Sequence, residues 1–141
     1  MISINSYLHF MGKAEEAMNF YKSVLGGQFT GFQRYKDMAG GNKIPAGDQE
    51  KMIHIALQIK ENITIMATDV MTAMESPVVC GNNYHICIQA EDRAEADRIF
   101  QGLSAAGKVE MPMSETFWGA YFGMCRDRFE VQWMINCEPK Q

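Results

Sequence analysis

At 141 residues the chain is long enough for one domain or for two small modules that share a core. Its composition, 47% hydrophobic and 21% charged, is that of an ordinary globular protein, and a formal net charge of −4 disfavours nucleic acid and anionic membranes as partners. The sequence contains no run of 18 apolar residues, which a membrane-spanning helix would need. The first residues also lack the pattern of a signal peptide, so we expect a cytoplasmic protein.

The first half of the chain predicts one β-α-β-β-β module. Residues 2–10 alternate between apolar and polar side chains, which is typical of a strand. An amphipathic helix is expected over 13–25, with Gly26 at its end. Glycines and prolines predict a long loop over 37–50. Three further strands are expected, over 29–35, 52–59 and 63–68.

The second half repeats this order, which indicates a duplicated unit. The helix segment that begins Ala14-Glu15 has an echo at Ala94-Glu95, inside a second expected helix over 92–106. Asp92 is a natural N-cap for that helix, and Gly107 is expected to end it. We place the modules at 1–70 and 83–141, with a linker over 71–82. The strands of the second module are expected over 84–90, 108–113, 119–125 and 131–136.

This pattern predicts an α+β fold in which each helix covers the apolar face of its sheet, while the more polar faces line a cleft. His9, His54 and His85 all fall on the polar faces, where an imidazole can act as a general base or bind a ligand. The alternative for each is a structural histidine that is satisfied by its neighbours. Gln132 falls on the same kind of face in the last strand.

Two further candidates lie between the second and third strands of the second module. Glu115 precedes an aromatic pair and can serve as an acid or base, or else as a salt-bridged or turn-capping residue. Trp118 offers a flat surface for a ligand ring, whereas Trp133 lies on an apolar strand face and is expected in the core.

The sulfur-containing residues are numerous. The four cysteines show no CxxC spacing, so we expect reduced and mostly buried thiols rather than a zinc site. The twelve methionines either fill the core or soften the wall of an apolar pocket.

Two segments carry a family resemblance. The helix segment Ala14–Gly27, and the stretch from Glu115-Thr116-Phe117-Trp118-Gly119 to Val131–Asn136, are similar to the PhnB-like, glyoxalase/bleomycin resistance branch of the vicinal oxygen chelate superfamily. This resemblance implies paired βαβββ modules that form one cupped mixed sheet with a cleft, and it implies a homodimer. Many relatives have a glycine where this chain has Glu130, so the geometry of the turn can differ here. Glu130 is expected to be a solvated turn residue, and the alternative is a new acid that faces the cleft.

Members of the superfamily that use a divalent metal hold it with two His and two Glu from the first and last strands of each module. Only His85 matches this set. The first ligand position of the first module falls at Asn5 or Ser6, and the last strand of that module has no acid before Asp69. The last ligand position of the second module falls at Met134, and Gln132 is the preceding residue on the same strand face. The resemblance therefore implies a module that binds a small molecule without the usual metal centre. The alternative is a metal-dependent lyase, isomerase or dioxygenase-type enzyme with a non-standard ligand set anchored by His85.

Overall fold

The computed structural model describes residues 2–72 and 77–139. It divides the chain into two compact units, Met1–Val79 and Cys80–Gln141, each of which is described here by itself. Part of the expected linker, residues 73–76, lies outside the described residues. Within the described residues, no helix is long and apolar enough to cross a membrane.

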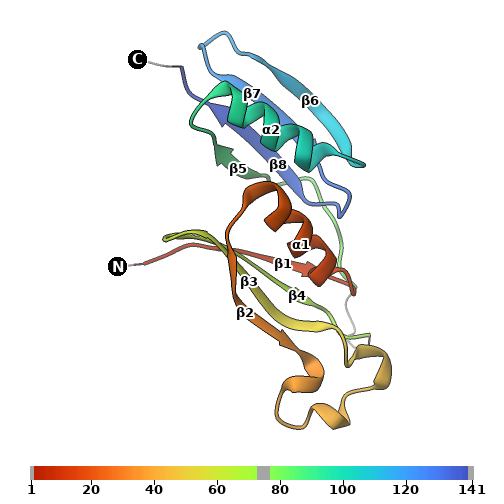
Figure 1. Ribbon diagram of the computed structural model, residues 1–141. Helices are drawn as coiled ribbons and strands as arrows, with labels where there is room; N and C mark the ends of the chain where they lie inside the picture. Colours follow the sequence, from red (N-terminus) through yellow and green to blue (C-terminus); the bar gives the residue numbers. More distant parts are fainter. Residues whose placement is uncertain (1, 73–76, 140–141) are drawn as a thin grey trace. The chain divides into compact units, whose positions relative to one another are not determined.

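The first unit is a four-stranded mixed sheet with one helix against it (Figure 1). The strand order is β1-β4-β3-β2, in which β1 and β4 are parallel and the other pairs are antiparallel. Parallel pairing of the first and last strands requires a long connection, and the helix and the two intervening strands supply it. The elements are β1 (Ser6–Phe10), α1 (Ala14–Leu25), β2 (Gln28–Arg34), β3 (Met52–Lys60) and β4 (Ile63–Asp69).

Helix α1 packs on the sheet through an apolar stripe at helical spacing. Ala14, Ala17, Met18, Tyr21 and Val24 are its buried residues. The helix ends at Gly26, as the sequence predicted, with a φ of 79° that favours glycine.

Asp69, the last residue of β4, caps the beginning of α1 from a distant part of the chain. Its Oδ1 atom accepts hydrogen bonds from the backbone N–H groups of Gly12 and Ala14, each at 2.9 Å. Its Oδ2 atom accepts a third from the N–H of Met52, also at 2.9 Å. The side chain is almost fully buried, so these amides are what compensates its lost hydration. Asp69 therefore joins α1, β3 and β4.

The connection from β2 to β3, where a long loop was predicted, contains three short 3₁₀ turns. Asp48, in the third turn, is buried and lies 2.8 Å from the Lys51 ammonium, and its carboxylate also accepts a bond from the Thr72 hydroxyl at 2.7 Å. The hydrogen bonds from Lys51 and Thr72 lower the pKa of Asp48. The charged group thus ties this connection to the residues that follow β4.

The second unit repeats the architecture of the first, with strand order β5-β8-β7-β6 and a parallel β5–β8 pair (Figure 1). This repetition confirms the predicted α+β fold class with two βαβββ modules. The elements are β5 (Ile86–Gln89), α2 (Arg93–Ser104), β6 (Lys108–Glu115), β7 (Tyr121–Arg126) and β8 (Gln132–Cys137). Asp92 caps α2 as predicted, because its carboxylate accepts a bond from the N–H of Glu95 at 2.8 Å.

The first strand and the end of the second helix differ from the prediction. β1 begins at Ser6, and Ile2 and Ile4 are 86% and 90% exposed, so their alternation does not reflect a buried face. Helix α2 does not end through Gly107. Ala106 takes the left-handed conformation instead, with a φ of 58°. Gly107 is needed for a different reason, since a Cβ there would lie 2.3 Å from the backbone oxygen of Arg126.

Glu130 adopts the left-handed conformation of a glycine turn, with a φ of 72°. The side chain is mostly exposed and lies 3.2 Å from Arg126, as expected of a solvated turn residue. The neighbouring Asp127 holds the turn, because its carboxylate accepts bonds from the N–H groups of Phe129 and Val131 at 2.7 and 3.1 Å. It also accepts one from the indole N–H of Trp133, which is buried in the core as predicted.

The expectation of mostly buried thiols holds for only half of the cysteines. Cys125 and Cys137 are buried, whereas Cys80 and Cys87 are exposed. Cys87 is exposed because it lies on the side of its sheet that α2 does not cover.

Candidate functional site

Each sheet has a face that points away from the helix of its own unit, and we call this the open face. On sheet 1 it carries Tyr7 and His9 of β1, His54 of β3 and Met66 of β4, because these residues alternate with the buried ones. On sheet 2 it carries the side chains that alternate with buried Trp133, Ile135 and Cys125. The polar residues predicted from the sequence are therefore divided between the open faces of two sheets.

Tyr7 gathers the two histidines of the first unit. Its hydroxyl lies 3.0 Å from Nδ1 of His54, and its ring centroid lies 5.7 Å from that of His9 and 5.8 Å from that of His54. Partial burial, and then the charge of Tyr35, raise the pKa of Tyr7. Gly31 makes room for this arrangement, since a Cβ there would lie 3.0 Å from the His54 ring. Tyr7 was not among the candidates, although its strand position indicated the face.

His85, immediately before β5, faces Glu110 of β6, the strand at the opposite edge of sheet 2. His85 Nε2 and Glu110 Oε1 lie 3.3 Å apart. Sequence reasoning missed Glu110, because β6 has an irregularity between Val109 and Met111 that breaks the simple alternation. A lone acid in a strand next to the interrupted alternation was the only available signal.

Gln132 is fully buried, and both ends of its amide are occupied. Its Nε2 donates to the carbonyl of Tyr84 at 2.7 Å, and its Oε1 accepts from Arg126 Nη2 at 3.0 Å. Arg126 also lies 3.2 Å from Glu130. Gln132 thus orders the residues before β5 and the guanidinium of β7, rather than offering a free group to a ligand.

Glu115 forms an ion pair with Arg93 at the start of α2, and the Arg93 guanidinium lies 4.8 Å from the centroid of the Tyr121 ring. The hydrogen bond to Glu115 raises the pKa of Arg93. Trp118 contacts Phe117 edge to face, with ring centroids 4.8 Å apart, and Phe117 is 98% exposed. Both candidates therefore lie beside the β6–β7 turn.

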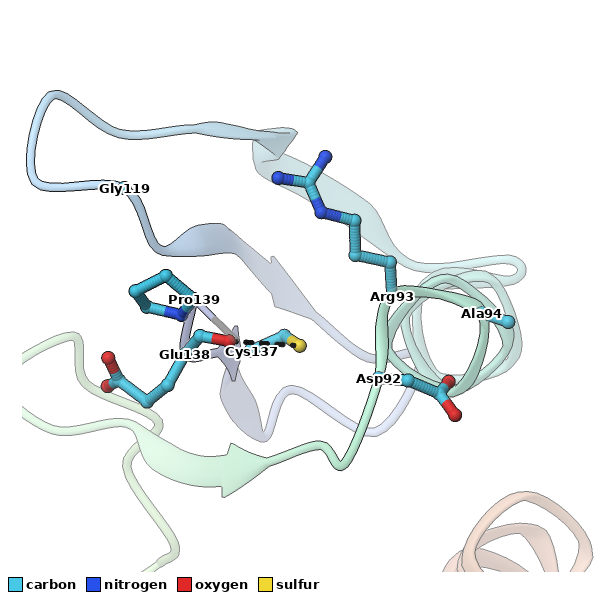
Figure 2. Close-up of a pocket in the computed structure, with 7 residues that line it drawn as sticks. All are labelled: Asp92, Arg93, Ala94, Gly119, Cys137, Glu138 and Pro139. Carbon is cyan, nitrogen blue, oxygen red and sulfur yellow. Dashed lines mark hydrogen bonds between the residues drawn. The ribbon is translucent and has the colours of Figure 1, made fainter. Parts of the chain in front are cut away.

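A pocket of about 620 Å³ lies at the start of α2 (Figure 2). Figure 2 shows Arg93 and Asp92 extending in different directions from the helix start, while Gly119 and Pro139 lie on the other side. None of the six predicted site residues lines this pocket. Its lining residues are Asp92, Arg93, Ala94, Gly119, Cys137, Glu138 and Pro139.

The donor groups do not fit the usual four-ligand metal centre. Within residues 2–72 and 77–139, no group of three or more His, Cys, Asp or Glu side chains is close enough to hold a metal ion. Asp69, the acid at the end of β4, is occupied by three backbone amides. The amide of Gln132 is occupied as well, which leaves His85 with Glu110 as a pair.

With this geometry in place, comparisons with known proteins identify the family. Residues 3–135 match the model of the Glyoxalase/Bleomycin resistance protein/Dioxygenase superfamily. The chain belongs to this superfamily. It is 30% identical to protein YjdN of Escherichia coli strain K12 over 146 aligned positions, which cover 98% of this chain and 97% of YjdN. The resemblance found in the sequence is thereby confirmed at the level of the superfamily.

Solved structures of similar fold were also found. The crystal structure of protein PA1353 from Pseudomonas aeruginosa is similar with a TM-score of 0.87 and 35% identity, covering 99% of this chain and 100% of that one. A PhnB protein from Bacillus cereus has a TM-score of 0.76 at 24% identity, covering 96% of this chain and 99% of its own, and supports the fold alone.

Proposed function

We propose that this superfamily member binds a small organic molecule against the open face of sheet 2, without the usual metal centre. The observation that carries the proposal is the His85–Glu110 pair beside half-buried apolar side chains. Met134 of β8 and Met124 of β7 are register partners on this face, and Phe122 lies two residues before Met124 on the same side. Sites for small molecules combine a largely apolar lining with a few placed polar groups.

The chemistry of the pair indicates what such a molecule contains. When Nε2 of His85 carries the proton, it donates to Glu110, and Nδ1 is left to accept a hydrogen bond. A ligand with a hydroxyl or N–H donor next to an apolar body suits this arrangement. The body would cover the methionines, whose flexible side chains adapt to different shapes.

A thermal-shift screen of small aromatic and hydroxylated compounds tests the proposal. A compound that binds only the folded state at about 100 times its Kd adds about 2.7 kcal/mol, which raises the Tm by several degrees. We expect the shift to disappear in His85→Ala and Glu110→Gln. His9→Ala is the matched control, because it removes an imidazole from the open face of sheet 1 and should leave the shift intact. An unchanged shift in His85→Ala would refute the site.

Metal analysis separates this proposal from the second candidate, a metal-dependent lyase, isomerase or dioxygenase-type enzyme anchored by His85. The match of His85 to a family ligand position favours that alternative. Untagged protein should contain far less than one divalent metal per chain, and Zn²⁺, Mn²⁺, Ni²⁺ or Fe²⁺ should not raise its Tm. A metal content near one ion per chain that is lost in His85→Ala would refute the proposal of a metal-free binding module and support the metal-dependent enzyme.

The family resemblance also leads us to propose a cytoplasmic homodimer. Large apolar side chains are exposed on both units, Phe32 on the first and Phe117 on the second. Light scattering coupled to size exclusion should give twice the mass of the chain, and a monomer at micromolar concentration would contradict this.

A further inference from the structure

Four sulfur-containing residues form one row across sheet 2. Cys87 of β5 is the register partner of Met134 in β8, Met134 is the partner of Met124 in β7, and Met124 is the partner of Met111 in β6. Each strand of the sheet thus contributes one sulfur at the same level. We call these four residues the sulfur row.

The sulfur row lies on the open face. Register partners in adjacent strands point to the same side of a sheet, and the residues that alternate with the row are buried toward α2. Cys87 and Met111 are exposed, and Met124 and Met134 are half-buried. The donors are therefore accessible, unlike methionines that fill a core.

The adjacent rows of the open face have a different chemistry. On one side, Arg126 is the partner of Gln132 and of Lys108. On the other side, Asn136 is the partner of Gln89, and its amide donates to Gln89 Oε1 at 2.8 Å. Within the strand register the sulfur row contains no other donor type, although the His85–Glu110 pair lies beside it.

Thiolates and thioethers are soft ligands, which favour Cu(I) over hard cations such as Mg²⁺. Partner residues in neighbouring strands have Cβ atoms about 5 Å apart, and methionine has three rotatable bonds, so sulfur atoms of adjacent strands can converge on one ion. We propose that the sulfur row binds a soft monovalent metal ion, Cu(I) or its analogue Ag(I), through the Cys87 thiolate and the thioethers of Met134 and Met124, with Met111 at the end of the row.

The binding step involves no electron transfer. The Cys87 thiol releases its proton to solvent, a sulfur–metal bond forms, and the thiolate neutralises the single positive charge of the ion. The thioethers add neutral donors. Before binding, the Cys87 sulfur accepts a long hydrogen bond from Gln89 Nε2, at 3.6 Å, which the metal would replace.

Titration with Ag(I) in chloride-free buffer tests the sulfur row, because Ag(I) is redox-inert. In a Cys80→Ser background, which removes the other exposed thiol, we expect one tight site per chain. This site should be lost in Cys87→Ser and weakened at least tenfold in Met134→Leu and in Met124→Leu. Leucine keeps the apolar surface and removes only the donor. Met66→Leu in the same background is the matched control, an open-face methionine outside the row, and it should leave this site unchanged.

Nuclear magnetic resonance of the wild-type protein, labelled with ¹³C at the methionine methyl groups, gives a second readout that needs no variant. One equivalent of Ag(I) should shift the methyl signals of Met124 and Met134, and not that of Met66. Affinity that depends on Cys87 but is unchanged in both leucine variants would show an isolated thiol and overturn the proposal. The test uses the metal alone, so its failure leaves the proposed binding of an organic molecule untouched.

Discussion

Cys125 lies on β7 with its side chain fully buried. Burial, and then the charges of Asp127 and Glu110, raise its pKa from 9.0 to about 12. The folded protein therefore keeps this proton at pH values where the unfolded chain loses it, and the thiol contributes stability below pH 9 that is lost as the pH rises toward 12.

The measurable consequence is the slope of the free energy of unfolding against pH. Above pH 9, this thiol alone should lower the free energy of unfolding by about 1.4 kcal/mol per pH unit. Urea unfolding at several pH values between 8 and about 10.5 should show a shallower decline in Cys125→Ala than in the wild type. Cys80→Ala, at an exposed thiol, should keep the wild-type slope. Equal slopes in all three proteins would exclude the effect.

Glu130 has a backbone conformation that costs a residue with a side chain about 1 kcal/mol relative to glycine. Glu130→Gly should therefore raise the free energy of unfolding by about that amount, even though it removes the ion pair with Arg126. That pair is on the surface, with the Glu130 side chain mostly exposed, and contributes little. Glu130→Ala tests the ion pair by itself, because it keeps the strain, and it should not stabilise the protein in chemical denaturation.

Two adjacent positions after α2 favour glycine for different reasons, Ala106 because of its backbone conformation and Gly107 because of its lack of space. Ala106→Gly should stabilise by about 1 kcal/mol, because Ala106 has a left-handed φ. Gly107→Ala should destabilise by more than that, because the new Cβ would meet the backbone oxygen of Arg126. Thermal unfolding of the two variants should move in opposite directions, and a shift of the same sign in both would contradict this account.

The two helix caps are expected to differ in strength. Asp69→Ala leaves three amides of α1 and β3 without their acceptor in a buried place, and should cost roughly 3 kcal/mol or more. Asp92→Ala removes one exposed cap bond at α2 and should cost about 1 kcal/mol. Denaturant unfolding measures both losses. If the two variants lost equal stability, Asp69 would not be the shared anchor that we describe.

Elements could be predicted from the sequence wherever their signals are local. The cap Asp92 and the helix end at Gly26 lie next to the helices they bound, and the alternation within β1 matches its alternating burial. Glu110 and Asp69 gave no such signal. Their partners are 17 or more residues away, and only strand pairing brings those partners close.

The candidate site was less predictable than the fold. His9, His54 and His85 were assigned to their faces correctly, because period-two alternation fixes the direction of a strand side chain. What each side chain contacts depends on neighbouring strands, and a single sequence does not give their register. For this reason the pairing of His85 with Glu110, the occupied amide of Gln132 and the sulfur row emerged only from the structure.

For the molecule as a whole, the position of Asp69 bears on the order of events during synthesis. The N-terminal turn of α1 obtains its buried acceptor from a residue more than fifty positions later, and β1 pairs with the strand that ends there. The first module therefore cannot complete its hydrogen bonding until β4 has left the ribosome. In a nascent chain that stops before Asp69, the first amides of α1 lack their acceptor and β1 lacks its partner strand. Because both modules pair their first strand with their last, each module can complete its fold only after its last strand has been synthesised.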